Sequence, residues 1–324
     1  MGSFNYRVLA DEIDVTSTIQ DRLLSLRITD ESGLTSDSLE IKLDDRDYAI
    51  EWPRHGAEIT VYLSTHLHGF LSMGIYVVDE IEHSGPPQTM TIRAKACDMR
   101  ASMKAPKTRS WEAVTIASLV QTIAAEHGLT AKVSDGLGSI LMPHLDQTNE
   151  SDLHLLARLA KDHDAIAKPV REYLVFVPKG SATSFTGKEM PVVNILASDI
   201  QQHRVSQTER ARFGSVTAYW HDVDRANKQP VTIGDNLPSF ALRHTYSSQD
   251  EAIYAAKAKL SQLGRGTASL SLTLLGNPFV QAEGRLLLKQ VRLPVNGKWV
   301  VDRVEHQLDS GGFITRCEAS IPSN

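Results

Sequence analysis

The sequence predicts a mainly β protein with a mixed α/β segment in its middle. Three observations lead to this prediction. Apolar and polar residues alternate with a period of two through the first hundred residues, the spacing becomes helical after about residue 108, and strand-like alternation returns after about residue 180. With 324 residues, the chain is long enough for two or three domains.

The first region predicts a series of half-buried antiparallel strands. LLSLRITD and LEIKLDDRD alternate in this way, and the Asp/Arg tail of the second predicts a turn. EITVYL, FLSMGIYVVDEIEHSG and TMTIRAKAC predict further strands, with SGPPQ as a loop because consecutive prolines cannot continue a ladder. Short strands at this spacing are typical of a small barrel or sandwich. The inward residues of the first two strands are expected to be Leu24, Leu26, Ile28, Leu39, Ile41 and Leu43.

Two helices are predicted in the central segment, from about residue 108 to 180. TIASLVQTIAAEHGL has the i, i+3, i+4, i+7 spacing of one buried face, with Thr115 as N-cap and Gly128 able to adopt the left-handed conformation after its end. A second helix is expected to begin near Ser151, and EYLVFVPKG returns to strand. The buried face of the first helix is predicted to be Ile116, Leu119, Val120, Ile123 and Ala124.

The third region has the same strand-like alternation as the first but contains one helix. RFGSVTAYW, TASLSLTLLG, EGRLLLKQVRL and KWVVDRVEHQLDSGGFITRCEASIP are expected strands, with a hairpin turn at DSGGF. The helix is predicted over residues 248–264, with Ser248 and Glu251 as a capping box and Gly264 as its end. Its buried stripe is expected to be Ala252, Ala256, Leu260 and Leu263.

Charge and composition exclude several classes of function. Lys and Arg number 34 against 39 Asp and Glu, a net charge of −5, and no basic run predicts sequence-specific binding to nucleic acid. Cys97 and Cys317 are far apart and have no neighbours at metal-ligand spacing, so neither a disulfide framework nor a zinc ribbon is expected. Neither an export signal nor a membrane span is predicted, and the expected place of synthesis is the cytoplasm.

The segment from His144 to Asp164, HLDQTNESDLHLLARLAKDHD, is the strongest candidate for a metal or acid/base site. On a helix, His154 and His163 are nine residues apart and point to opposite sides, so they cannot bind one ion together. No HExxH pattern is present. The segment therefore predicts an ordinary helix with polar ends, whose buried stripe is Leu153, Leu156, Ala157 and Ala160, widened by Leu155 and Leu159.

Other candidates are weaker. His221, Asp222 and Asp224 could bind a cation, although Asp-rich segments after a strand more often form turns. The run Asp44 to Asp47 lacks the rest of a calcium loop. Gly136 and Gly138 lack a third glycine and a preceding strand, which favours a loop over a dinucleotide site. His66 and His68 lie in an expected hairpin.

No catalytic, cofactor-binding or metal-ligating residue is assigned, and no cofactor is expected. A catalytic carboxylate pair formed only in the fold stays open. Trp52, Trp220 and Trp299 are equally compatible with interface anchors and with core residues.

Five segments, in order along nearly the whole chain, carry a resemblance to a known family. They are LLSLRITDESGLTSDSLEIKLDDRD, GIYVVDEIEHSGPP, the helix ending IAAEHGL, LDQTNESDLHLLARLA, and GKWVVDRVEHQLDSGGFITRCEASIP. The sequence resembles the late control protein D family, the baseplate hub proteins of contractile phage tails and R-type pyocin particles. In that family, LDQTNESDLHLLARLA introduces a helix and carries no known chemistry.

The resemblance implies a non-enzymatic structural protein that forms a homotrimer. Residues 1–105 and 185–324 would be two tube-like β-barrel domains, the second with the helix 248–264 inserted, and residues 106–184 an α/β middle domain. Two related barrels per chain give a pseudo-sixfold ring, which adapts a sixfold tail tube to a threefold central spike. The implied partners are the tube or its initiator, the spike, the tape-measure protein and baseplate wedge proteins. The implied location is the baseplate of a virion or tail-like particle assembled in the bacterial cytoplasm.

Two alternatives remain at this point. The middle α/β segment has about the length of small glycan-binding modules, so a peptidoglycan-binding or peptidoglycan-cleaving tail protein is one. A secretion spike is the other, and the absence of a long C-terminal repeat disfavours it.

Overall fold

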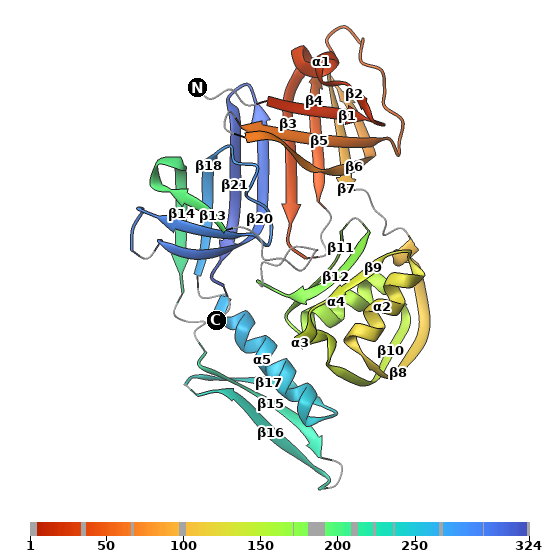
Figure 1. The fold of residues 1–324 in the computed structure, drawn as a ribbon, viewed down its shortest axis with the longest axis vertical. Helices are drawn as coiled ribbons and strands as arrows, with labels where there is room; N and C mark the ends of the chain where they lie inside the picture. The colour runs from red at the N-terminus through yellow and green to blue at the C-terminus, as the bar shows by residue number, and fades with distance from the viewer. Residues whose placement is uncertain are drawn as a thin grey trace.

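The computed structural model describes residues 5–33, 37–65, 68–96, 102–170, 172–180, 192–208, 213–222, 225–235, 237–265, 268–293 and 295–322. Strands dominate, and four separate groups of buried side chains divide the chain into four packed units (Figure 1). The mainly β class with a central α/β segment, predicted from the sequence, is therefore confirmed.

The first β unit, residues 5–96, is a sheet folded around one apolar core. Its long strand β6 joins two parts of the unit, since its first half pairs with β5 and its second half with β7. The elements are β1 (Asn5–Ala10), β2 (Ile13–Asp14), α1 (Thr16–Ile19), η1 (Gln20–Arg22), β3 (Leu23–Glu31), β4 (Ser38–Asp44), β5 (Glu58–Thr65), β6 (His68–Ser84) and β7 (Thr89–Ala96).

The inward residues of this unit match the prediction with one exception. Leu26 and Ile28 on β3 are buried, as are all three predicted residues of β4, and the SGPPQ segment is the loop between β6 and β7. Leu24, however, is 41% exposed. The β3–β4 register shifts between Leu23 and Ser25, and such a bulge puts the extra residue out of the alternation that the prediction assumed.

The middle unit, residues 102–180, packs two helices between two small sheets. The β10–β8 pair lies on one side and the sheet β11–β12–β9 on the other (Figure 1). Its elements are η2 (Ser102–Lys104), β8 (Pro106–Thr115), α2 (Ile116–Glu126), β9 (Thr130–Val133), α3 (Asp135–Gly138), β10 (Leu141–Ser151), α4 (Asp152–Asp162), β11 (Ala165–Val170) and β12 (Tyr173–Pro178).

Local signals predicted both longer helices well. The side chain of Thr115 caps α2, Gly128 has φ +68° after its end, and all five predicted residues of its inner face are buried. Ser151 caps α4. The α4 stripe is rotated from the prediction, because Leu155, Leu156, Leu159 and Ala160 are buried while Leu153 and Ala157 are only partly so. The loop predicted at Gly136 and Gly138 is the one-turn helix α3.

The second β unit comprises residues 192–208 and 268–322, with an α/β unit inserted between them. The inserted unit is larger than the predicted helix: α5 (Gln249–Arg265) covers the sheet β16–β15–β17 and shares a small core with it. Gly264 lies inside the last turn of α5, so it does not end the helix. The remaining elements are β13 (Val192–Leu196), η3 (Ala197–Asp199), β14 (Ile200–Gln207), β15 (Ser215–Asp222), β16 (Asn227–Gly234), β17 (Ser239–Tyr246), β18 (Ala268–Leu275), β19 (Arg285–Lys289), β20 (Gly297–Asp309) and β21 (Gly312–Ser320).

The cap of α5 differs in one detail from the predicted box. The Ser248 hydroxyl accepts a hydrogen bond from the Glu251 N–H, as expected. The Glu251 carboxylate, however, accepts hydrogen bonds from Ser247 rather than from Ser248. On the inner face, Ala252 and Ala256 are buried, and the two predicted leucines pack partly buried against the same core.

The two β units are joined edge to edge inside one chain. Strand β3 of the first unit pairs antiparallel with β20 of the second, from Arg303 opposite Glu31 to Asp309 opposite Ser25. This β3–β20 joint makes one sheet of thirteen strands in the order β14–β18–β21–β20–β3–β4–β7–β6–β5–β1–β2, with β19 and β13 branching from β20.

The two β units have the same strand order. The run β3–β4–β7–β6–β5–β1 corresponds to β14–β18–β21–β20–β19–β13. The residues 77–83, VVDEIEH, and 300–306, VVDRVEH, occupy equivalent places on β6 and β20. Both segments have a bulge after the second valine, and that valine makes the same two backbone hydrogen bonds: Val78 to Gly56 and Ala57, Val301 to Glu283 and Gly284. The second unit therefore repeats the first.

Candidate functional site

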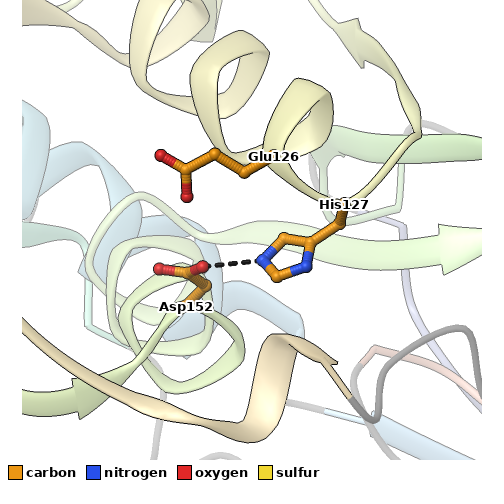
Figure 2. Close-up of side chains that lie close together, drawn as sticks. All are labelled: Glu126, His127 and Asp152. Atoms are coloured by element: carbon orange, nitrogen blue, oxygen red, sulfur yellow. Dashed lines mark hydrogen bonds and ion pairs between the residues drawn. The ribbon is translucent and has the colours of Figure 1, made fainter.

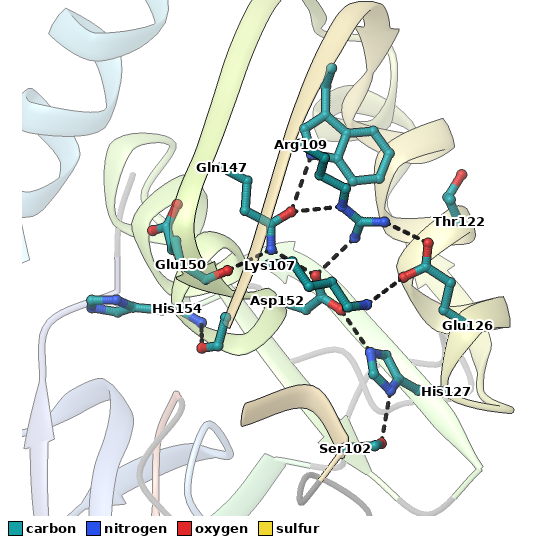
Figure 3. Close-up of polar contacts among 12 residues, drawn as sticks. Ser102, Lys107, Arg109, Thr122, Glu126, His127, Gln147, Glu150, Asp152 and His154 are labelled. Atoms are coloured by element: carbon teal, nitrogen blue, oxygen red, sulfur yellow. Dashed lines mark hydrogen bonds and ion pairs between the residues drawn. The ribbon is translucent and has the colours of Figure 1, made fainter. Parts of the chain in front are cut away.

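A buried aspartate lies at the centre of a charged cluster in the middle unit (Figure 3). Asp152 is the first residue of α4, directly after the capping Ser151, and its side chain is fully buried. The pairing of β8 with β10 places Lys107, Arg109 and Gln147 beside Asp152. The end of α2 places Glu126 and His127 there. The Asp152 cluster consists of Ser102, Lys107, Arg109, Glu126, His127, Gln147 and Asp152.

Four side chains donate hydrogen bonds to Asp152. Lys107 Nζ lies 2.6 Å from its carboxylate, Arg109 Nη2 2.8 Å, Gln147 Nε2 2.8 Å and His127 Nε2 2.7 Å. Burial alone would raise the pKa of Asp152, but the hydrogen bonds from His127, Lys107 and Gln147 lower this pKa to about 2. The carboxylate is therefore ionised at neutral pH.

Glu126, His127 and Asp152 offer ligand atoms close enough together for one metal ion (Figure 2). The ammonium of Lys107 already bridges the two carboxylates, 2.7 Å from Glu126 and 2.6 Å from Asp152, and Arg109 lies 2.6 Å from Glu126. Two basic side chains thus balance two acidic ones. A divalent ion would have to displace a hydrogen-bonded lysine, so this arrangement favours an internal ion-pair network over a metal centre.

Ser102, His127 and Asp152 also form a hydrogen-bonded chain. Ser102 Oγ lies 2.8 Å from His127 Nδ1, and His127 Nε2 lies 2.7 Å from Asp152. In a nucleophilic triad the carboxylate stabilises the imidazolium that forms. Here that carboxylate already binds two cations, and the His127 side chain is 4% exposed. The geometry therefore favours a structural role, in which the cluster ties α2 and α4 to β8.

The other histidines of the 144–164 segment do not join this cluster. His144 is exposed and pairs with Glu112 and Asp146. His154 is exposed on α4, while His163 ends α4 and packs edge-on against Tyr254 of α5. Burial lowers the pKa of His163. Residues 152–162 form the predicted helix, but the prediction missed the buried Asp152.

The weaker candidates are mostly engaged in turns and ion pairs. Asp45 accepts a hydrogen bond from the Ile50 N–H, Asp44 pairs with Arg46, and Asp47 with Arg22, which makes the predicted turn rather than a calcium loop. Asp222 accepts from the Arg225 N–H, also in a turn. Asp224, His66, the side chain of His68, and Cys97 lie outside the described residues, and Cys317 is buried in the second β unit.

The three tryptophans have different environments. Trp299 is buried and its Nε1 donates to the Val295 carbonyl, so it is a core residue. Trp220 is partly buried against the core of the inserted unit. Trp52 is 57% exposed and stacks on His83, and it is therefore the one of the three that is available for contact with another chain.

A second candidate site is the polar face of the thirteen-stranded sheet, opposite the two cores. Ion pairs cross this face from strand to strand and from one β unit to the other. They alternate in sign, from Glu82 and Glu80 to Arg93, then Glu40, Arg27, Glu305 and Arg316, with N–O distances between 2.9 and 3.9 Å. Their charges largely cancel, so the face offers many polar groups but no strong field of one sign.

A third group of charges links the three larger units. Lys168 of the middle unit lies 3.1 Å from Asp37 and 3.7 Å from Asp30 of the first β unit. Asp30 accepts a hydrogen bond from the Ala282 N–H of the second unit, and Glu283 accepts one from Gly33. Burial and the nearby Asp37 raise the pKa of Asp30 to about 7, and burial raises that of Glu283. Lys168 therefore links the middle unit to the place where the two β units meet, and the β3–β20 pairing joins those two units directly.

The sequence contained signals for the Asp152 cluster that were not used. Lys107 and Arg109 are two apart and so share one face of a strand, while Glu126 and His127 end a predicted helix. Nothing local, however, brings the strand and the helix end to Asp152. Among the described residues, no helix is long and apolar enough to cross a membrane.

Comparisons with known proteins agree on one type of protein. Residues 55–312 match the family described as phage tail baseplate hub (GPD). A probable baseplate hub protein of Escherichia phage 186 is 33% identical over 353 residues, which covers 95% of this chain and 90% of that protein. The 43 kDa tail protein of prophage MuSo2 from Shewanella oneidensis has a TM-score of 0.72 at 14% identity and 99% coverage of both chains. An E. coli type VI secretion component, described as similar in structure to the T4 tail proteins gp27 and gp5, has a TM-score of 0.59 at 12% identity and covers 99% of this chain and 77% of that one.

Proposed function

This chain belongs to the phage tail baseplate hub (GPD) family, and we propose that three copies of it form a ring to which each copy contributes two equivalent β domains. In this proposal residues 1–105 and 185–324 are the two tube-like barrels, and residues 106–184 are the α/β domain between them. The ring then has threefold symmetry overall and six similar positions around its axis.

The observation that carries this proposal is the repeat within the chain. Both β units have the same strand order, and one is paired to the other through β3 and β20. A chain that already contains two similar units in edge-to-edge contact needs only one further type of contact to build a six-membered ring from three copies.

Such a ring would solve a mismatch of symmetry. Six similar β units facing one way could meet a sixfold tail tube or its initiator, while three middle domains facing the other way could meet a threefold central spike. We expect wedge proteins around the outside and the tape-measure protein in the channel. The proposed location is the baseplate of a phage tail or tail-like particle, assembled in the bacterial cytoplasm, with no membrane partner.

We propose the polar face of the thirteen-stranded sheet as the lining of the channel. The alternating ion pairs leave no surplus of lysine or arginine there, from Arg93 across Glu40 and Arg27 to Glu305. A lining rich in unpaired cations would bind DNA through its phosphates and slow its passage, whereas a balanced one would not. No enzymatic role is proposed for this surface.

The mass of the purified chain in solution tests the ring. Light scattering should be measured on the protein alone and on a mixture with the spike protein encoded beside it. A trimer, or a three-to-three complex with the spike, is expected. A monomer under both conditions would refute the proposal.

Incubation with purified peptidoglycan tests the alternative role of the middle domain. A structural hub should neither bind the insoluble wall material nor release soluble fragments from it. Retention that is lost in the Asp152→Asn variant would point instead to a wall-directed function of residues 106–184. Circular dichroism of the variant would show whether it still folds.

A further inference from the structure

Building on the ring proposed above, we propose how its copies are joined: β6 of one copy pairs antiparallel with β14 of the next, in the register that repeats the β3–β20 joint. The partner is thus a second copy of this chain. The surface consists of two strand edges, residues 81–84 of β6 and residues 204–207 of β14.

Both edges have no strand partner among the described residues. Strand β14 pairs with β18 on one side only and is the last strand of the sheet. Strand β6 pairs with β7 through Ser84, but its pairing with β5 stops at Val77. Each edge therefore presents backbone N–H and C=O groups that a neighbouring strand can bind.

The same two edges are paired where they occur a second time in the chain. Strand β20 is the equivalent of β6: its pairing with β19 stops at Val300, the equivalent of Val77, and beyond this point it pairs with β3. Strand β3 is the equivalent of β14, because β4 and β18 are their corresponding neighbours. The β3–β20 joint thus shows directly how a β6-like edge accepts a β14-like edge.

The equivalence also predicts the register. On β20, Glu305 faces Thr29. Glu82 takes the place of Glu305 within the repeated VVDxxEH segment. Ser206 takes the place of Thr29 when β14 and β18 are aligned with β3 and β4, and the register shift then falls at the same place in both pairs. Glu82 should therefore lie opposite Ser206, and His83 opposite Val205.

The predicted pairs are chemically complementary. Arg204 is the equivalent of Arg27, is exposed, and has no ion-pair partner among the described residues. It would lie diagonally across from Glu82, as Arg27 lies from Glu305 at 3.9 Å in the β3–β20 joint. Ile81 and Val205 are each partly buried at the margin of their own cores, and pairing would cover both. In the β3–β20 joint the position of Ile81 is held by Val304, which is fully buried. The ladder of alternating charges on the polar face would also continue from one copy to the next.

A disulfide across the joint tests the register. The double variant Glu82→Cys with Ser206→Cys would be made in a background of Cys97→Ser and Cys317→Ala, which removes both native thiols. Directly opposed cysteines on antiparallel strands are close enough to bond. Mild oxidation should link copies covalently into dimers and trimers on a non-reducing gel.

The chain supplies a matched positive control. Thr29→Cys with Glu305→Cys places cysteines at the same positions of the β3–β20 joint, so oxidation should close a disulfide within one chain without linking copies. Glu82→Cys with His203→Cys is the off-register control, because three residues along a strand are about 10 Å, beyond the reach of a disulfide.

Charge reversal provides an independent test. Arg204→Glu should weaken association by about fivefold at each joint, because like charges would then lie diagonally across it, and Glu82→Arg in the same chain should restore it. A trimer by light scattering whose copies are not linked through positions 82 and 206, although the control at 29 and 305 closes, would overturn this joint and leave the ring intact. A monomer, alone and with the spike, would overturn both.

Discussion

The two β units contain the same VVDxxEH segment, yet its histidine has a different environment in each. His83 of the first unit is 24% exposed, stacks on Tyr48 and lies 3.3 Å from Asp45. His306 of the second unit is 1% exposed and is held between the Thr315 hydroxyl and the Val280 carbonyl. Burial lowers the pKa of His306 to about 4. The same position in the same strand arrangement is thus partly exposed in one unit and buried in the other.

The units also differ in what is attached to the frame. The connection between β3 and β4 is short, whereas the equivalent connection between β14 and β18 contains the whole inserted α/β unit. At the other end, β1 runs antiparallel to β5 but β13 runs parallel to β19. The five central strands are therefore the repeated part, and the differences lie in one connection and in the last strand of each unit.

The largest expected effect is at the contact between the middle unit and the first β unit. Lys168→Met leaves the carboxyl groups of Asp30, Asp37 and Glu283 without their buried cation, and removing one partner of a buried ion pair costs about 3 kcal/mol of unfolding free energy. Urea unfolding at pH 7 should show this loss. The deficit should shrink toward pH 5, because the raised pKa of Asp30 lets it bind a proton in the folded state. A pH-independent deficit would contradict the assignment.

The buried histidine of the second unit predicts a loss of stability in acid. Because the pKa of His306 falls from 6.5 to about 4 on folding, the unfolded chain binds the proton more readily, so stability is lost as the pH drops from about 6.5 to 4. The loss is on the order of 3 kcal/mol. His306→Gln should remove this part of the pH dependence, measured as the difference from the wild type in urea unfolding.

Truncating a side chain should have different effects at the paired edge of β20 and at the unpaired edge of β6. Val304→Ala removes fully buried methyl groups in the β3–β20 joint and should cost about 2 kcal/mol of chain stability. Ile81→Ala, at the equivalent place on the free edge, should cost less stability because Ile81 is only partly buried, but it should weaken self-association. Thermal unfolding together with light scattering separates the two effects. Equal losses of stability would argue against the equivalence of the edges.

The smallest effect is expected on the polar face. Arg93→Ala and Arg316→Ala remove exposed ion pairs to Glu82 and Glu305, which are equivalent residues of the two units. Each should change the free energy of unfolding by less than about 1 kcal/mol. If either costs several kcal/mol, the face is a stability element rather than a lining.

Local spacing in the sequence was enough to determine most elements and their inner faces. The caps Thr115 and Ser151, the five buried residues of α2 and the buried residues of β4 all follow from rules that act within a few residues. The same rules assigned the helix 248–264 and the SGPPQ loop. Five quoted segments were also sufficient for the family.

Only the tertiary structure decided the features that matter for assembly. The exposure of Leu24 depends on a bulge, and the cluster around Asp152 depends on a strand, a helix end and a cap that meet from separate parts of the chain. The joint of β3 with β20 connects segments nearly the full length of the chain apart. The physical reason is the sequence separation of the interacting residues. Periodicity and capping depend on residues a few positions apart. Strand register, burial of a charge and edge pairing depend on which distant strand packs against the segment.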